Sequence, residues 1–362
     1  MEQPARDPNE DPAYLEASHR AAEKFSNSLT GSCRAVPPSE LLQDTDKLKG
    51  KVVLVTGAGS GIGYAFCTFA ATLGSILVLV DFNEDSIKTL KREIDESNVS
   101  GEAHITPRTS VSDWNGLRSV FEWADQKFGR IDSVIACAGV TEDQNPSYDA
   151  EVLDKDGKLQ APSLRTLDVN LIGTIYTLKL ARYYMRKRKV KGSVVLLGSL
   201  SSFFGLPLGP MYTTSKHGVY GLTRSVAYSA APDGININMV APWFVKTPIL
   251  NVPVKLLLAG LPYTKMPDVV NAITYAATCR DLAGAALPVD PKGVFIVPHD
   301  TSNFGQGGFN AVFGQRTATV IARTAVIRDY VEILGGAVVG PATVLAGLSA
   351  VVAYFAWQQY SA

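Results

Sequence analysis

The chain has 362 residues, with 34 lysines and arginines against 34 aspartates and glutamates, so its formal charge at neutral pH is zero. This balance gives no reason to expect binding to nucleic acid or electrostatic steering of a strongly charged substrate. The four cysteines, at positions 33, 67, 137 and 279, have neither metal-site nor disulfide spacing, and the four histidines form no cluster. The sequence therefore predicts free thiols in a reducing compartment and no metal.

Residues 1–48 form a polar N-terminal extension, with prolines at positions 4, 8, 12, 37 and 38. The extension has no apolar core segment, so it does not resemble a secretory signal. We expect one helix over Ala13–Phe25 and otherwise partly mobile chain.

A short β-branched segment, Val52–Val55, predicts a buried parallel strand, and a glycine-rich turn and a helical stretch over Tyr64–Leu73 follow it directly. Strand, glycine turn and helix in this order are typical of a dinucleotide-binding site. Glycine permits the tight turn and lets the backbone approach a pyrophosphate at the positive end of the helix. We predict that the cofactor contacts at this turn are Gly57, Ser60, Gly61, Ile62 and Gly63.

The second predicted strand, Ile76–Val80, ends at Asp81, about twenty residues beyond the glycines. An acidic side chain at this place accepts hydrogen bonds from the adenosine ribose hydroxyls and repels a 2′-phosphate. The turn has no Arg or Lys at Ala58 or Ser60 to counter such a phosphate. The sequence therefore favours NAD over NADP, although an aspartate that closes a strand can also be a simple turn former.

Apolar segments at 133–136, 193–197, 235–240 and 293–297 continue the alternation of strands and helices to about residue 300. This alternation predicts an α/β fold, in which residues 49–300 form one doubly wound parallel sheet, a single Rossmann domain. Ligands of such sheets bind outside the carboxyl ends of the strands, where every motif named here falls. Ala138 and Gly139 follow the 133–136 strand and let the backbone lie near the adenosine half of a cofactor.

Tyr212 and Lys216 stand four residues apart, which places them one turn apart on the same face of a helix. An ammonium beside a phenol favours the phenolate, so the pKa of the tyrosine is expected to fall toward the range of a general acid/base. Ser199, after the 193–197 strand, offers a hydroxyl to the same substrate oxygen. Such a pair also arises by chance as a half-buried tyrosine beside a surface lysine, and the upstream nucleotide motif is what favours catalysis.

These motifs resemble those of the short-chain dehydrogenases/reductases over residues 49–300, with similarity to the 15-hydroxyprostaglandin dehydrogenase-like branch. The matching motifs are Thr56-Gly57-x-x-x-Gly61-x-Gly63, Ala136-x-Ala138-Gly139, and a tetrad of Asn170, Ser199, Tyr212 and Lys216. The resemblance implies that Tyr212 is the acid/base and that Ser199 orients the substrate oxygen. It also implies that Lys216 holds the nicotinamide ribose and lowers the pKa of Tyr212, while Asn170 supports a water in a proton relay.

The same resemblance places Val245 and Thr247 against the nicotinamide carboxamide, and counts Asn170, Tyr212 and Lys216 among the cofactor contacts. The chain departs from the family pattern at two places. Trp243 stands where a glycine usually follows the proline after the sixth strand, which reshapes the nicotinamide end of the pocket. Ser110-Val111 replaces an Asp-Val pair near the adenine, and Asp113 is the expected substitute.

Apolar residues gather where this fold lines its substrate pocket: Phe203, Phe204, Leu206, Pro207, Leu208, Trp243, Phe244 and the segment 250–263. We expect a hydrophobic alcohol or ketone, such as a polyketide, terpenoid, steroid or lipid, interconverted by hydride transfer with a nicotinamide cofactor. Two alternatives stay open. One is a non-catalytic NAD-binding sensor or scaffold, and the other is an epimerase or dehydratase of the same fold.

Residues 301–332 predict a glycine-rich loop and a helical segment, and residues 333–357 contain no charged side chain. About twenty-five apolar residues are enough to cross a hydrocarbon layer of ~30 Å, so we expect a C-terminal membrane anchor on a cytoplasmic catalytic domain. An apolar tail packed on the protein is the alternative. The resemblance also implies a homodimer or homotetramer, paired through helices over 170–184 and 212–228.

Overall fold

The structure is a computed structural model that describes residues 33–143, 148, 150–207, 209–250, 255, 258 and 260–297. The expected helix over 13–25 and the segments 301–332 and 333–357 lie outside this part of the chain. Within the described residues no helix is both long enough and apolar enough to cross a membrane. The C-terminal membrane anchor therefore stays a prediction.

One sheet of nine strands runs through the described residues, in the order β1-β9-β8-β7-β6-β5-β2-β3-β4. The strands from β2 to β8 pair in parallel, whereas β9 and β1 add two antiparallel strands at one edge. The strands are β1 (Arg34–Val36), β2 (Val52–Thr56), β3 (Ile76–Val80), β4 (Glu102–Ile105), β5 (Ser133–Ala136), β6 (Ser193–Leu197), β7 (Asn236–Pro242), β8 (Ala286–Asp290) and β9 (Gly293–Ile296). The doubly wound sheet is confirmed, and the last predicted strand proves antiparallel.

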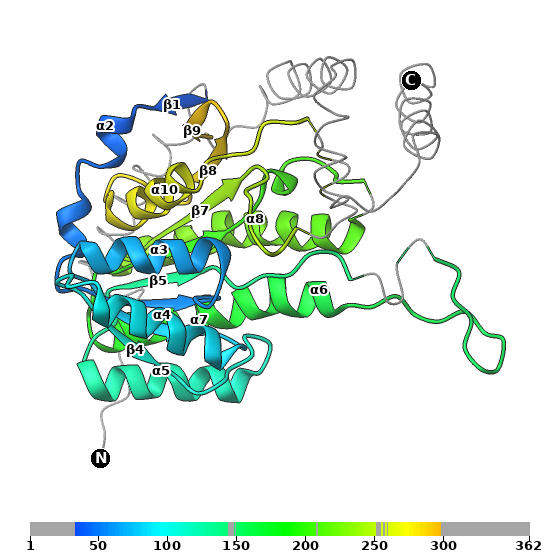
Figure 1. Ribbon diagram of the computed structural model, residues 1–362, viewed down its shortest axis with the longest axis horizontal. Coiled ribbons are helices and arrows are strands. Elements are labelled where there is room, and N and C mark those ends of the chain that lie inside the picture. The colour runs from blue at the N-terminus through cyan, green and yellow to red at the C-terminus, as the bar shows by residue number, and fades with distance from the viewer. Residues whose placement is uncertain are drawn as a thin grey trace, which may run out of the picture. The chain divides into compact units, whose positions relative to one another are not determined.

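Two groups of helices cover the sheet (Figure 1). In one group α3 (Gly61–Thr72) contacts both α4 (Glu84–Glu96) and α10 (Met266–Thr278). In the other group α7 (Gly173–Lys187) contacts both α5 (Trp114–Phe128) and α8 (Pro210–Ala230). Buried residues of α3, α4 and α10 share one apolar cluster, which contains no residue of the second group. The two groups therefore lie on opposite faces.

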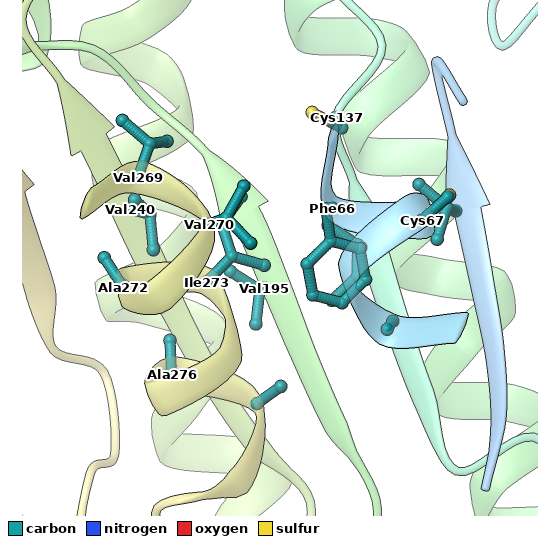
Figure 2. Packing of buried hydrophobic residues seen from close by; sticks show 14 of the residues in the cluster. Phe66, Cys67, Cys137, Val195, Val240, Val269, Val270, Ala272, Ile273 and Ala276 are labelled. Atoms are coloured by element: carbon teal, nitrogen blue, oxygen red, sulfur yellow. The ribbon is translucent and has the colours of Figure 1, made fainter. Parts of the chain in front are cut away.

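The cluster between α3 and α10 fixes the face of the sheet that carries the glycine turn. Figure 2 shows Val270 and Ile273 of α10 directed toward Val195 of β6, with Phe66 of α3 opposite them. Phe66 and Ile273 are completely buried. Burial of each such side chain stabilises the fold by about 1.5–3 kcal/mol. The start of α3 therefore rests on a close-packed layer.

The sheet domain begins before the predicted boundary at residue 49. The segment assigned to the polar extension contributes β1, the short helix α2 (Pro38–Leu41) and a 3₁₀ turn, Thr45–Leu48. Arg34 donates two hydrogen bonds to the Glu40 carboxylate at 2.7 and 2.8 Å, and the Tyr275 hydroxyl of α10 donates a third. A strand of three residues is too short to show a recognisable alternation of apolar and polar residues in the sequence. Only its pairing with β9 defines β1 as a strand.

Between β5 and α6 (Arg165–Leu167) the chain makes a long excursion, whose residues 150–164 we call the arm; in Figure 1 it extends well away from the sheet. Asp154 closes its turn by accepting hydrogen bonds from the backbone of Asp156 and Lys158, both at 2.9 Å. Leu153 and Leu159 pair across the turn and remain 58% and 67% exposed. The arm therefore has a defined turn but buries little apolar surface of its own.

Candidate active site

A cavity of about 400 Å³ lies at the carboxyl ends of β2, β3 and β5. This is the edge at which ligands of doubly wound sheets bind. The predicted contacts that line it are Gly57, Ser60, Gly61, Ile62, Gly63, Asp81, Ala138, Gly139 and Thr247. The structure thus brings most of the predicted cofactor residues together from four separate segments.

Two glycines of the turn, Gly57 and Gly63, occupy positions at which a side chain would collide with backbone. A Cβ on Gly63 would lie 2.1 Å from the Gly57 carbonyl oxygen, and one on Gly57 would lie 2.6 Å from the Ala138 Cα. Gly57 also has a φ of +72°, a conformation that favours glycine. The Ser60 side chain makes no capping hydrogen bond at the start of α3. The first turn of α3 is thus closely approached by backbone and has no side-chain cap among the described residues.

Asp81 closes the adenosine end of the cavity. Its Oδ2 accepts a hydrogen bond from the Gly59 N–H and its Oδ1 one from the Asn83 N–H, both at 2.8 Å. Each oxygen retains a lone pair for a ribose hydroxyl. Phe82 lines the cavity next to it and is 58% exposed, and the Arg108 guanidinium lies 3.8 Å from the centre of the Phe82 ring.

The tyrosine and lysine of α8 meet the serine that follows β6. Lys216 Nζ donates a hydrogen bond of 2.9 Å to the Leu197 carbonyl oxygen and lies 5.6 Å from the centre of the Tyr212 ring. The Ser199 side chain lies close enough to the Tyr212 phenol to lower its pKa. None of the three side chains lines the cavity itself, but Lys216 is hydrogen-bonded to the carbonyl of Leu197, which does line it.

Burial, and not Lys216, dominates the ionisation of Tyr212. Desolvation raises the pKa of the Tyr212 phenol above its ordinary value, and the hydrogen bond with Ser199 opposes this rise. Desolvation also lowers the pKa of Lys216 to about 8, while attraction to Cys137 opposes that fall. The depression of the tyrosine pKa expected from the Lys216 charge is therefore not found, because desolvation is the largest influence on the Tyr212 pKa.

Asn170 lies in a single π-helical turn, Asp168–Ile172, and is 1% exposed. Its Oδ1 accepts from the Val140 N–H at 2.8 Å, and its Nδ2 donates to the Val140 carbonyl at 2.9 Å and to Ser215 Oγ at 3.2 Å. π-turns inside helices are frequent at functional sites. In this arrangement the Asn170 amide joins the chain after β5 to the helix that carries Tyr212.

Some predicted contacts lie elsewhere. Val245 is buried and does not line the cavity, although Thr247 does. Ser110 and Val111 line the cavity, whereas Asp113, the expected substitute near the adenine, caps α5 through a 3.0 Å hydrogen bond from the Asn115 N–H. The lining also contains residues that the sequence motifs did not indicate: Phe82, Thr109, Ser112, Arg165, Asp168, Val169, Pro248 and Ile249. Phe82 follows Asp81 directly, but nothing in the sequence spacing marks Arg165 or Asp168.

Aromatic side chains gather beyond Ser199. The rings of Trp243 and Phe244 lie 4.6 Å apart, and those of Trp243 and Phe204 lie 6.3 Å apart. Phe203 packs edge-on against Tyr220 of α8 at 5.0 Å. Trp243 therefore joins an aromatic group at the place where the family pattern has glycine. Leu208 and half of the predicted lid over 250–263 lie outside the described residues.

A second cavity, of about 470 Å³, lies at the amino ends of β2, β5 and β6. Its basic lining residues are Lys47, Lys51, Arg130, Arg188, Lys189, Lys191 and Arg280. Arg188 pairs with the buried carboxylate of Asp125 at 2.6 Å, and Arg130 pairs with Asp132. Basic residues near helix carboxyl ends offset the negative end of the helix dipole. No predicted site residue lines this cavity, so we assign these charges to the fold.

Comparisons with known proteins agree with the geometry at the carboxyl ends. Residues 51–254 match the family model of the short chain dehydrogenases. The chain is 33% identical to the short-chain dehydrogenase/reductase prx4 of Penicillium roqueforti over 240 residues, which are 66% of this chain and 68% of that protein. It is 32% identical to the NAD(+)-dependent 15-hydroxyprostaglandin dehydrogenase of Rattus norvegicus over 56% of this chain and 71% of the relative.

Two further comparisons extend over more of the fold. The 5'-hydroxyaverantin dehydrogenase of Dothistroma septosporum is 29% identical over 72% of this chain and 90% of its own length. The crystal structure of a short-chain type dehydrogenase/reductase from Mycobacterium marinum has the same fold, with a TM-score of 0.61 at 22% identity, covering 69% of this chain and 98% of the other.

The chain belongs to the short-chain dehydrogenase/reductase family. Its sheet is the Rossmann sheet of that family, and the cavity lies at the carboxyl ends of the strands, the edge at which such sheets bind their ligands. The protein is accordingly an NAD(P)-dependent oxidoreductase that interconverts an alcohol and a ketone. This membership sets aside the alternative of a sensor without turnover.

Proposed function

We propose that the enzyme uses NAD to interconvert a secondary alcohol and a ketone on a hydrophobic small molecule, in secondary metabolism. The observation that carries the proposal is that Tyr212, Ser199 and Lys216 lie close to one another, beside the cavity that Leu197 and Asp81 line. Proton transfer and hydride transfer are thereby assigned to neighbouring parts of one site.

The side chains divide the proton chemistry between them. In the oxidation direction Tyr212 accepts the hydroxyl proton of the substrate, and in the reduction direction it returns a proton to the ketone oxygen. Ser199, whose side chain lies beside Tyr212, donates a hydrogen bond to the same oxygen and fixes its position. The nicotinamide, when bound, supplies or removes the hydride. Lys216 places a cation beside Tyr212 that stabilises the phenolate when the proton has moved.

The turn before α3 suits the diphosphate of a dinucleotide. Its first helical turn is uncapped, and a Cβ at Gly57 or Gly63 would collide with backbone. Backbone N–H groups at such a helix start bind phosphate oxygens. Asp81 lies where a ribose hydroxyl needs an acceptor, which favours NAD. The residues that would hold the cofactor are Gly57, Ser60, Gly61, Ile62, Gly63, Asp81, Ala138, Gly139, Lys216 and Thr247.

The aromatic group of Phe204, Trp243 and Phe244 favours an apolar substrate. The relatives named for 5'-hydroxyaverantin and 15-hydroxyprostaglandin are both dehydrogenases of hydroxylated molecules. We extend this pattern to a polyketide, terpenoid, steroid or lipid-like alcohol. An epimerase or dehydratase would use Tyr212 without net change in the cofactor, so cofactor absorbance during turnover separates it from a dehydrogenase.

The test is turnover of a panel of hydrophobic alcohols and ketones by wild type and by Tyr212→Phe, with NAD and NADP in parallel. Tyr212→Phe removes one hydroxyl, so kcat is expected to fall by about 10²–10⁴ while NAD binding is retained. Tyr183→Phe, on the exposed surface of α7, is the matched control and should behave as wild type. Wild-type kcat in Tyr212→Phe would refute the assignment.

Assembly into a homodimer or homotetramer through α7 and α8 also stays a proposal. Leu178 and Val219 of these helices are buried within a single copy and are not available for pairing. Leu171, Ile175, Leu222 and Val226 keep part of their surface exposed and are the remaining candidates. Light scattering at micromolar concentration tests this, and a monomer would exclude the pairing.

A further inference from the structure

The start of α8 has no local cap. Its N-cap residue is Gly209, which has no side chain, and Pro210 follows at the first helical position. Met211 and Tyr212 therefore hold the second and third helical positions, whose N–H groups usually bond to an N-cap Ser, Thr, Asp or Asn side chain. The residue at the third position is the proposed acid/base itself.

A carboxylate from elsewhere in the chain takes the place of that cap. Glu142 Oε1 accepts the Met211 N–H at 3.2 Å, and Glu142 Oε2 accepts the Tyr212 N–H at 2.6 Å. Glu142 precedes Tyr212 by 70 residues and lies in the segment between Gly139 and the arm. A carboxylate is favoured here because it stands at the positive end of the helix dipole.

The segment that carries Glu142 is held on both sides. Before it, Val140 exchanges two backbone hydrogen bonds with the Asn170 side chain. Around it, the fully buried Thr166 donates to the Thr141 carbonyl at 3.0 Å and accepts the Asp143 N–H at 3.1 Å. Both sets of hydrogen bonds are made by residues that follow the arm in the chain, Thr166 in α6 and Asn170 in the π-helical turn after it. The Glu142 carboxylate is thereby fixed in position and is not a mobile surface group.

We infer that Glu142 is a positioning residue that fixes the first turn of α8 and so places the Tyr212 hydroxyl for proton transfer. The inference rests on the proposed function for the role of Tyr212, whereas the cap itself is independent of it. Proton transfer requires close alignment, and a displacement of about 1 Å can cost ~10²-fold in rate. The cofactor cavity is lined by Gly139 and Val140 but not by Glu142, so cofactor binding is left unchanged.

Three variants test this. Glu142→Gln keeps the shape and one acceptor, Glu142→Ala removes both acceptors, and Glu151→Gln makes the same chemical change on the exposed arm. We expect kcat to fall about 10-fold in Glu142→Gln and about 100-fold in Glu142→Ala. The dissociation constant of NAD, from fluorescence titration of the same samples, and the KM for NAD should stay at the wild-type values, as should every property of Glu151→Gln.

The second readout needs no turnover. Hydrogen exchange of the peptide that contains Met211 and Tyr212 should accelerate in Glu142→Ala, less in Glu142→Gln, and not in Glu151→Gln. Unchanged exchange, unchanged kcat, or a fall in kcat that only matches a fall in the NAD-binding fraction would overturn the inference. If the wild type turns over no alcohol or ketone, the proposed function fails, and the exchange result still decides whether Glu142 caps α8.

Discussion

The starts of α3 and α8 lie at the same edge of the sheet. Each has backbone N–H groups without partners inside the helix, and the two starts differ in whether a side chain accepts hydrogen bonds from these groups. α3 begins at Gly61 with no side-chain cap, and its first turn lines the cofactor cavity. α8 begins at Pro210, and Glu142 accepts hydrogen bonds from its second and third N–H groups. An open helix start is suited to an external phosphate, and a closed one holds a side chain in place.

Local sequence would assign the two starts the other way round. Ser60 is among the preferred N-cap residues and has the extended backbone of such a residue, yet its hydroxyl makes no capping bond. Gly209 cannot cap, and yet the start of α8 is capped from a distance. The comparison teaches that a helix start is classified by what reaches it in space and not by the residue that precedes it.

The largest expected effect is a loss of NAD affinity when a side chain is added at Gly63, in the first turn of α3. In Gly63→Ala the new Cβ would lie 2.1 Å from the Gly57 oxygen, so the turn must move away from its position beside Ala138. We expect the affinity for NAD to fall at least about 100-fold, equivalent to ~2.7 kcal/mol. Fluorescence titration measures it. Wild-type affinity in this variant would show that the turn does not hold the diphosphate.

Lys216 lies one helical turn after Tyr212 in α8. Burial of its ammonium is expected to lower the free energy of unfolding. Its pKa is about 8 in the folded protein, against ~10.4 when unfolded, so the unfolded chain binds the proton more tightly. Between these values stability rises with pH, because the unfolded state holds a proton that the folded state has lost.

Lys216→Met should therefore be inactive but more stable than wild type by about 1–3 kcal/mol at pH 7, after the loss of the hydrogen bond to Leu197. The advantage should shrink as the pH rises from 8 toward 10. Urea unfolding at several pH values measures both quantities. A variant less stable than wild type at pH 7 would contradict the assigned cost.

Asp81 lies beside the glycine turn that precedes α3, and the Asp81→Asn variant is expected to weaken the preference for NAD over NADP. The change removes the charge that repels a 2′-phosphate but keeps an acceptor for the Gly59 N–H. Arg108, stacked on Phe82, already provides a cation next to this position. We expect the preference for NAD to fall about tenfold, or ~1.4 kcal/mol. Asp85→Asn, on the exposed side of α4, is the control, and a wild type that prefers NADP would refute the idea.

The smallest expected effect is a change in stability on replacing Gly221, a glycine of α8 that lies outside both helix starts. Gly221 lies within α8 on its exposed side, and a Cβ there would meet nothing within 4 Å. Gly221→Ala should stabilise the protein by about 0.5–1 kcal/mol and leave NAD binding unchanged. Thermal unfolding measures it. Destabilisation would mean that this face of α8 is covered, for example by a second copy.

The sequence by itself determined the parts of the protein that are local along the chain. The apolar runs of β2, β3, β5 and β6 and the glycine turn are set by short-range sterics and period, and their positions agree with the structure. The spacing of Tyr212 and Lys216 likewise predicted a shared helix face. These features depend on residues within one or two turns of each other, so a pattern in the sequence is enough to indicate them.

Only the tertiary structure decided what residues distant in sequence do for one another. β1 exists as a strand because β9 offers it an edge, and Glu142 is a helix cap because the segment after β5 passes the start of α8. Burial, which belongs to the whole fold, raised the pKa of Tyr212 where the local pattern predicted a fall. Each of these depends on desolvation or on contacts across many residues, and no periodicity in the chain records them.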